Sequence, residues 1–181
     1  KIVSEHYNPI IEQIRNLDKP VIAAVNGVAA GAGANIALAC DIVVATKSAS
    51  FIQAFSKIGL IPDSGGTYTL TRLVGLQKAS ALMMLGDKVA AEEAQEMGMI
   101  YKVFEDEEFE KSSMKIAQKL SLMPTKALAY TKKLLNESFQ NSLSEQLKLE
   151  DKYQSLAGKS YDYEEGVNAF LEKRPASFKG K

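Results

Sequence analysis

The stretch KPVIAAVNGVAAGAGANIALACDIVVA, residues 19–45, decides the fold. It contains an apolar run, 21–25, without a polar face, which is typical of a strand buried between two layers. The glycine- and alanine-rich segment 27–33 predicts a turn. Residues 34–40 then predict a helix, and 42–45 predict a second buried strand. This succession indicates a layered α/β architecture.

Residues 21–45 are also apolar enough to be considered as a membrane-spanning helix. However, Asn26, Asn35 and Asp41 interrupt the run, and its glycines would weaken a continuous helix. We therefore interpret the run as the core of a globular protein and expect no membrane partner.

The flanking sequence extends the α/β pattern. Apolar residues at helical spacing predict a helix over 5–17, which ends before Pro20. Short strands are predicted at 50–52 and 99–104, and helices at 65–74, 78–85, 91–97, 107–122, 124–139, 142–157 and 163–173. We expect an α/β core over 1–105 and a helical C-terminal region over 106–181. Because the sequence opens with lysine rather than methionine, already inside what looks like a helix, we also expect that further residues precede Lys1.

Composition excludes several classes of function. The 181 residues carry 22 basic and 22 acidic side chains, and this balance argues against a nucleic-acid partner. One cysteine, Cys40, excludes an internal disulfide and a cysteine-rich zinc site. One histidine, His6, leaves little material for a metal site, so none is predicted. A reducing, cytoplasmic compartment fits this cysteine usage best.

The segment from Gly27 to Asn35 is the first candidate site. Its small residues let a ligand approach the backbone, and the N–H groups of a helix start attract negative charge. Such donors can stabilise an oxyanion. The alternative is close packing of a helix on a sheet, which composition alone favours. The spacing matches neither a dinucleotide-binding loop nor a Walker A loop.

Asp63 is the second candidate. It lies between an apolar stretch and a helix start, in the string IPDSGGT, residues 61–67. A carboxylate at the wall of an apolar pocket can act as a proton shuttle. Alternatively, Asp63 or Ser64 is the N-cap of the helix, because both residue types are favoured there.

Together these segments resemble the crotonase family, the enoyl-CoA hydratases and isomerases. The resemblance runs from about Lys19 to Phe178 and rests on an ordered set of motifs rather than on one glycine pattern. These motifs are KPVIAAVNG (19–27), GAG (31–33), ACDI (39–42), GLIP (59–62), GGT (65–67), RLVG (72–75), GDKVAAEEA (86–94), GMI (98–100), EG (165–166) and AFLEKR (169–174).

The resemblance implies a spiral of ββα units with C-terminal helices that assemble trimers, often stacked as hexamers. It implies an oxyanion hole of two backbone N–H groups around a thioester oxygen, one of them from Ala32. The second donor belongs to an earlier loop for which we find no counterpart after Lys1. It also implies an acyl-CoA substrate, with coenzyme A entering as part of the substrate and no other cofactor. The substrate-binding residues would be Val28, Gly31, Phe55 and Leu60, and the residues binding coenzyme A would be Phe170 and Lys173.

Two departures from the family pattern bear on the reaction. The two glutamates of the related hydratases fall at Asn35 and Phe55, and neither residue can act as an acid or base. Asp63 stands where hydratases usually carry glycine, and its context resembles the isomerases that open an epoxide in phenylacetate degradation. One carboxylate is sufficient for a 1,3-proton shift.

The sequence therefore predicts an acyl-CoA isomerase with Asp63 as the catalytic acid/base. An enoyl-CoA hydratase is the alternative within the family, and use of the enolate for C–C cleavage or dehalogenation is a further one. A crotonase-fold module that binds acyl-CoA without catalysis is the alternative outside enzymes.

Overall fold

The computed structural model describes all residues, 1–181, and the chain divides into two compact units. The first comprises residues 1–15 and 21–115, and the second comprises 16–20 and 116–181. None of the helices is long and apolar enough to cross a membrane.

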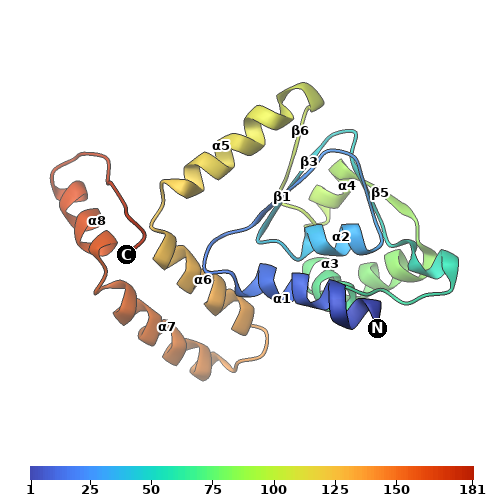
Figure 1. Cartoon of the computed structure of the whole chain (residues 1–181), viewed down its shortest axis with the longest axis horizontal. Helices are drawn as coiled ribbons and strands as arrows, with labels where there is room; N and C mark the ends of the chain where they lie inside the picture. Colours follow the sequence, from blue (N-terminus) through green and yellow to red (C-terminus); the bar gives the residue numbers. More distant parts are fainter. The chain divides into compact units, whose positions relative to one another are not determined.

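The first unit contains two small sheets that share one connection pattern (Figure 1). The chain forms β1 (Ile22–Val25), β2 (Val28–Ala30) and α2 (Ala32–Leu38), and then repeats this order with β3 (Ile42–Thr46), β4 (Ser50–Ile52) and α3 (Gly66–Leu85). Because β3 pairs with β1 and β4 pairs with β2, both in parallel, each ββα unit lies beside the previous one. This is the predicted succession of ββα units.

The remaining strands complete the two sheets. β5 (Lys88–Ala90) pairs antiparallel with β4, and β6 (Lys102–Phe104) pairs in parallel with β3. The strand orders are therefore β1-β3-β6 and β2-β4-β5. In Figure 1 the two sheets form the sides of a wedge, with α2 and α4 (Ala91–Glu96) between them.

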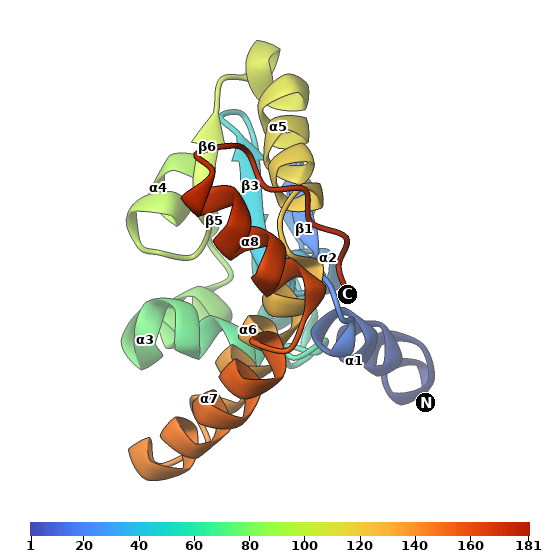
Figure 2. The ribbon, with the colours of Figure 1, turned by 90° about the vertical axis from the view of Figure 1, so that its left-hand side faces the viewer.

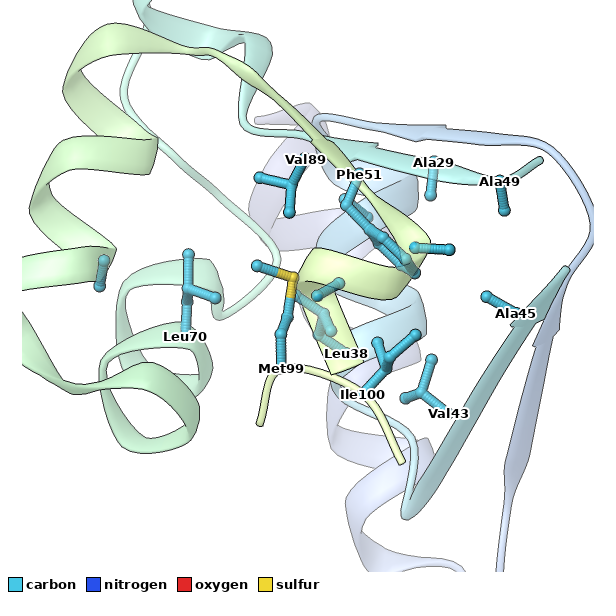
Figure 3. Packing of buried hydrophobic residues seen from close by; sticks show 14 residues of the cluster. Ala29, Leu38, Val43, Ala45, Ala49, Phe51, Leu70, Val89, Met99 and Ile100 are labelled. Atoms are coloured by element: carbon cyan, nitrogen blue, oxygen red, sulfur yellow. The ribbon is translucent and has the colours of Figure 1, made fainter. Parts of the chain in front are cut away.

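Side chains from both sheets fill the space between them. Phe51 and Val89 come from one sheet, Val43 and Ala45 come from the other, and Figure 3 shows all four within one cluster. Leu38 of α2 belongs to the same cluster and is 4% exposed. Burial of these apolar side chains is the main favourable term in folding this unit, and it fixes α2 between the sheets.

Asp41 ties the beginning of this core to the first helix. Its Oδ2 accepts from the Val21 N–H over 2.8 Å, and its Oδ1 accepts from Arg15 Nη1 over 3.1 Å. Arg15 also donates to the Ala39 carbonyl and lies in α1 (Asn8–Asn16), which follows the short π-helix η1 (Val3–Tyr7). The carboxylate therefore holds the start of β1 and the end of the α2 segment together.

Several local predictions need correction. The segment 27–33 is not only a turn, because it contains the strand β2, and β5 was not predicted at all. β1 is an edge strand with Ala24 exposed, so it is not buried on both faces in this chain. The predicted helices 65–74 and 78–85 are joined in α3, with a non-helical break at Gly75, where φ is 78°.

The second unit is helical. After η3 (Asp106–Glu108), α5 (Phe109–Ser121) leads into it, and it continues with α6 (Thr125–Glu137), α7 (Leu143–Ala157) and α8 (Tyr161–Leu171). Residues 16–20 belong to it because Lys133 Nζ lies 2.7 Å from Asp18 Oδ1 and Lys132 Nζ donates to the Lys19 carbonyl.

The C-terminal tail folds back along α8 (Figure 2). The buried carboxylate of Asp162 accepts from the N–H groups of Lys179 and Gly180 over 2.7 and 2.9 Å. Arg174 forms a two-pronged ion pair with Glu165, whose Oε1 also accepts from the Ser177 N–H. These bonds hold the tail on the first turns of α8.

Candidate functional site

The start of α2 presents the predicted oxyanion donor. Gly31 is the N-cap of α2, with φ 54° and ψ −125°, a conformation that only glycine adopts readily. Its N–H donates to the Ile52 carbonyl over 2.8 Å. Ala32 is the first residue of the helix, so its own N–H has no acceptor within the helix. That N–H is therefore suited to binding an oxyanion.

Phe55 packs against this helix start. Its side chain is buried, and its ring lies 3.6 Å from the position that a Cβ on Gly31 would occupy. It belongs to the short 3-10 helix η2 (Ala54–Ile58), in the connection between β4 and α3. The structure thus brings together Gly31 and Phe55, two of the predicted substrate-binding residues.

Val28 and Leu60, the other two, are exposed at 66% and 60% of their surface. Leu60 lies in a run of exposed apolar side chains with Ile58 and Ile61. Contiguous exposed apolar side chains mark surfaces that bind a partner or an apolar ligand. Ile58 and Ile61 were not singled out from the sequence, although their type and spacing beside Leu60 could have indicated them.

Asp63 lies in a tight loop before α3 and is half-buried. The predicted capping role is wrong, because Gly65 is the N-cap of α3 and no side chain caps the helix. Instead, Asp63 Oδ1 accepts a hydrogen bond from Ser64 Oγ over 2.9 Å, and the Asp63 carbonyl accepts from the Gly66 N–H over 2.9 Å. The Asp63 carboxylate therefore makes no hydrogen bond to the end of α3, and the hydroxyl of Ser64 donates to it.

Ser64 has an unusual backbone for a residue with a side chain. Its φ is 50°, in the left-handed region, and only 1% of its surface is exposed. Residues other than glycine are uncommon in this region and cluster at functional sites. Sequence reasoning considered Ser64 only as a helix cap and missed its contact with the carboxylate.

Asn35 connects the two parts of the site. It is completely buried one helical turn after Ala32, and its Nδ2 donates to the Asp63 carbonyl over 2.9 Å. Its Oδ1 accepts from the buried amide of Gln53 over 2.7 Å. The loop of Asp63 is therefore attached to the helix whose start carries Ala32.

Phe170 and Lys173 belong to the second unit. Phe170 is 82% exposed on α8, and Lys173 follows the end of that helix with φ 54°. An exposed phenyl ring can pack on a flat heterocycle, and a lysine can pair with phosphate. Both residues are thus accessible within their own unit.

Comparison with known proteins identifies the family. The family model for enoyl-CoA hydratase/isomerase matches residues 1–181, so the chain belongs to the enoyl-CoA hydratase/isomerase family. The predicted α/β crotonase fold is thereby confirmed, since the structure also resembles the crystal structure of an enoyl-CoA hydratase from Polaromonas sp. JS666. That likeness has a TM-score of 0.90 at 39% identity and covers 93% of this chain and 66% of the other.

Two curated relatives bear on the reaction. The chain is 50% identical over 179 residues to the 1,2-epoxyphenylacetyl-CoA isomerase of Escherichia coli K12, covering 99% of this chain and 68% of that protein. It is 46% identical over 180 residues to a "probable enoyl-CoA hydratase" of Rhodobacter capsulatus, covering 99% and 70%. The chain spans about two thirds of the length of these relatives.

Proposed function

We propose that this protein is an acyl-CoA isomerase in which Asp63 moves a proton along a thioester enolate. The carrying observation is that the main-chain carbonyl of Asp63 accepts a hydrogen bond from Asn35, which lies in the helix whose first N–H is the predicted oxyanion donor. Similarity to a 1,2-epoxyphenylacetyl-CoA isomerase supports the isomerase assignment, and similarity to a protein named as a hydratase keeps hydration as the alternative.

The proposed reaction begins with a 3-enoyl thioester whose carbonyl oxygen lies on the Ala32 N–H. The Asp63 carboxylate removes a proton from C2, and the negative charge moves onto the thioester oxygen, where the N–H stabilises it. The protonated Asp63 then returns the proton to C4, so that the double bond becomes conjugated with the thioester. One carboxylate performs both transfers, and no water is consumed.

Hydration is less well supported by the residues present. Addition of water needs one group to activate the water and another to protonate the α-carbon. Asn35 is a buried amide engaged at both ends, and Phe55 is a buried hydrocarbon ring. Neither can take a proton, so Asp63 alone would have to serve both roles.

The activity of the full-length protein on 3-hexenoyl-CoA and on crotonyl-CoA tests this proposal. We expect appearance of the conjugated enoyl thioester from the first and little hydration of the second. Asp63→Asn should lower kcat for isomerisation by roughly a hundredfold to ten-thousandfold. Because Asp63 does not cap α3, Asp63→Asn should melt close to the parent. Normal turnover by a folded Asp63→Asn protein, or hydration faster than isomerisation, would reject the proposal.

An epoxyphenylacetyl-CoA substrate tests the finer assignment. If the protein belongs functionally with the ring-opening isomerases, as its similarity to one suggests, it should convert this epoxide at a rate comparable to double-bond migration. Conversion of enoyl-CoA alone would leave the general isomerase proposal intact and reject the role in phenylacetate degradation. The cytoplasmic location inferred from the single cysteine stays a prediction.

A further inference from the structure

We propose that Asn35 is a positioning residue for Asp63, and that Gln53 fixes the orientation in which Asn35 does this. The proposal rests on the proposed function of Asp63 and adds two residues to its site. Neither side chain need touch the substrate, because both are buried and act through the main chain of the Asp63 loop.

The geometry of Asn35 carries the proposal. Its side chain has no exposed surface, so its amide must find partners inside the protein. Nδ2 donates to the carbonyl oxygen of Asp63 itself, and that oxygen also accepts from the Gly66 N–H. Two donors on one carbonyl fix the peptide plane that follows Asp63. They thereby restrict the backbone at Asp63, from which the carboxylate side chain extends.

Gly66 allows this close approach. A Cβ on Gly66 would lie only 2.3 Å from Asn35 Nδ2, closer than any real contact. The glycine is therefore required by Asn35 at this position, rather than by its own backbone, which is helical. The amide of Asn35 therefore packs closely against the start of α3. The Asp63 loop comes directly before this helix in the sequence.

Gln53 supports the orientation in which the amide nitrogen of Asn35 faces Asp63. Its Nε2 donates to Asn35 Oδ1 over 2.7 Å, so the nitrogen of Asn35 is directed to the Asp63 carbonyl. Gln53 is 5% exposed, and its own Oε1 is buried without a hydrogen-bond partner. A buried unsatisfied oxygen is unfavourable for folding and needs an explanation. We explain the retention of Gln53, with its unsatisfied Oε1, by the hydrogen bond through which it orients Asn35.

A set of variants of the full-length protein separates positioning from packing. Asn35→Ala removes the donor and leaves a hole, whereas Gly66→Ala pushes the amide away. The double variant Asn35→Ala/Gly66→Ala refills much of the space without restoring the donor.

We expect the melting temperature, lowered in Gly66→Ala, to recover largely in the double variant. We expect kcat to stay lowered by about tenfold to a hundredfold in all three, because displacement of a catalytic group has effects of this size. KM should change little.

Gln53→Met provides an independent test if the double variant folds poorly. Methionine retains the length of the side chain and removes the donor to Asn35. It also removes the unsatisfied Oε1 while leaving Asn35 Oδ1 unpaired, so the number of unsatisfied buried oxygens is unchanged and the melting temperature should stay close to the parent. We expect kcat to fall because the Asn35 side chain loses the second hydrogen bond that holds it and can move away from the Asp63 carbonyl.

The outcomes distinguish this proposal from the one on which it rests. Recovery of kcat along with stability in the double variant would show that Asn35 only fills space, and normal kcat in Gln53→Met would show that Gln53 does not hold Asn35 in its position. If Asp63→Asn is inactive in the same assays, the proposed function survives that result. If Asp63→Asn turns over 3-hexenoyl-CoA normally, both proposals are rejected together.

Discussion

Ser64 Oγ donates a hydrogen bond to Asp63 Oδ1 over 2.9 Å, from a backbone conformation that a serine rarely adopts. The serine is buried, and its hydroxyl is directed to this carboxylate oxygen. A left-handed residue with a side chain costs roughly 1–2 kcal/mol. The protein thus accepts backbone strain next to the carboxylate to which we assign the chemistry.

Two substitutions of Ser64 should separate the hydroxyl from the strain. Ser64→Ala keeps the strained backbone and loses the hydrogen bond, so stability should fall by about 1 kcal/mol. Ser64→Gly loses the same bond but relieves the strain, so its stability should stay near the parent. Both should lower kcat for isomerisation. Urea unfolding and steady-state kinetics check this, and normal kcat in either variant would contradict a role for the hydroxyl.

Gly31→Ala should disturb the start of α2. The conformation at Gly31 costs a residue with a side chain about 1–3 kcal/mol, and a change of this backbone would redirect the Ala32 N–H. Stability and kcat should both fall.

The ring of Phe55 supplies the control for Gly31. A Cβ on Gly31 would lie 3.6 Å from that ring, an ordinary contact distance, so steric overlap is not the expected cause. Phe55→Leu in the Gly31→Ala background should therefore not recover stability. Recovery in urea unfolding would show that crowding by Phe55, rather than the backbone, makes glycine necessary.

The Glu165–Arg174 ion pair should make the tail of the second unit sensitive to acid. Hydrogen bonds from Arg174 first, and then from the Ser177 N–H, lower the pKa of the Glu165 carboxyl from 4.5 to about 2. A lowered folded-state pKa means that the ionised pair stabilises the protein fully above the ordinary pKa. That contribution is lost as the pH falls from about 4.5 through about 2.

Glu165→Gln should therefore be less stable than the parent at pH 7, with a difference that shrinks toward pH 2. Thermal or urea unfolding of the parent and of Glu165→Gln, between pH 7 and pH 2, measures this difference in stability. Glu164→Gln on the same helix turn is a matched control, because Glu164 is exposed. A stability difference for Glu165→Gln that does not depend on pH would contradict the assignment.

We predict that the full-length protein forms a trimer or a dimer of trimers. Leu143 and Leu147 of α7 are 75% and 54% exposed, and Leu147 borders a hollow of about 570 Å³ between α6 and α7. Exposed apolar faces of this kind are usually covered in closed symmetric oligomers. Leu147→Glu should shift the protein to smaller species in light scattering.

The control for this oligomer prediction is Lys152→Gln, which makes the same change in charge on a different face of α7. It should leave the mass unchanged. A monomeric parent protein at micromolar concentration would contradict the prediction, and so would equal effects of the two substitutions.

Lys173→Ala should weaken binding of coenzyme A, because we predict an ion pair between Lys173 and a phosphate of the ligand. The loss should be largest at low salt, since screening reduces the contribution of exposed charges. Lys159→Ala removes another exposed lysine of the same unit and should have little effect. Equal affinities for the parent and Lys173→Ala in calorimetry at low salt would reject the assignment.

The sequence predicted those parts of this protein that local chemistry specifies. The apolar runs of β1 and β3 could be predicted as strands because strands of a layered α/β fold carry few polar side chains. The break at Gly75 and the helices of the second unit follow from glycine chemistry and helical periodicity. Asp63 was found because it is a carboxylate within an ordered set of family motifs.

Only the tertiary structure decided the rest, because the remaining features depend on partners distant in the chain. β2 and β5 are three residues long, and each is defined by its pairing with β4. Gly65 rather than Asp63 is the N-cap of α3, so the Asp63 carboxylate does not cap the helix. Asn35 contacts Asp63 across 28 positions of the sequence, and packing of α2 on the start of α3 creates that contact. The order of residue types along the chain does not specify such a contact, because it forms only when the core holds both helices in place.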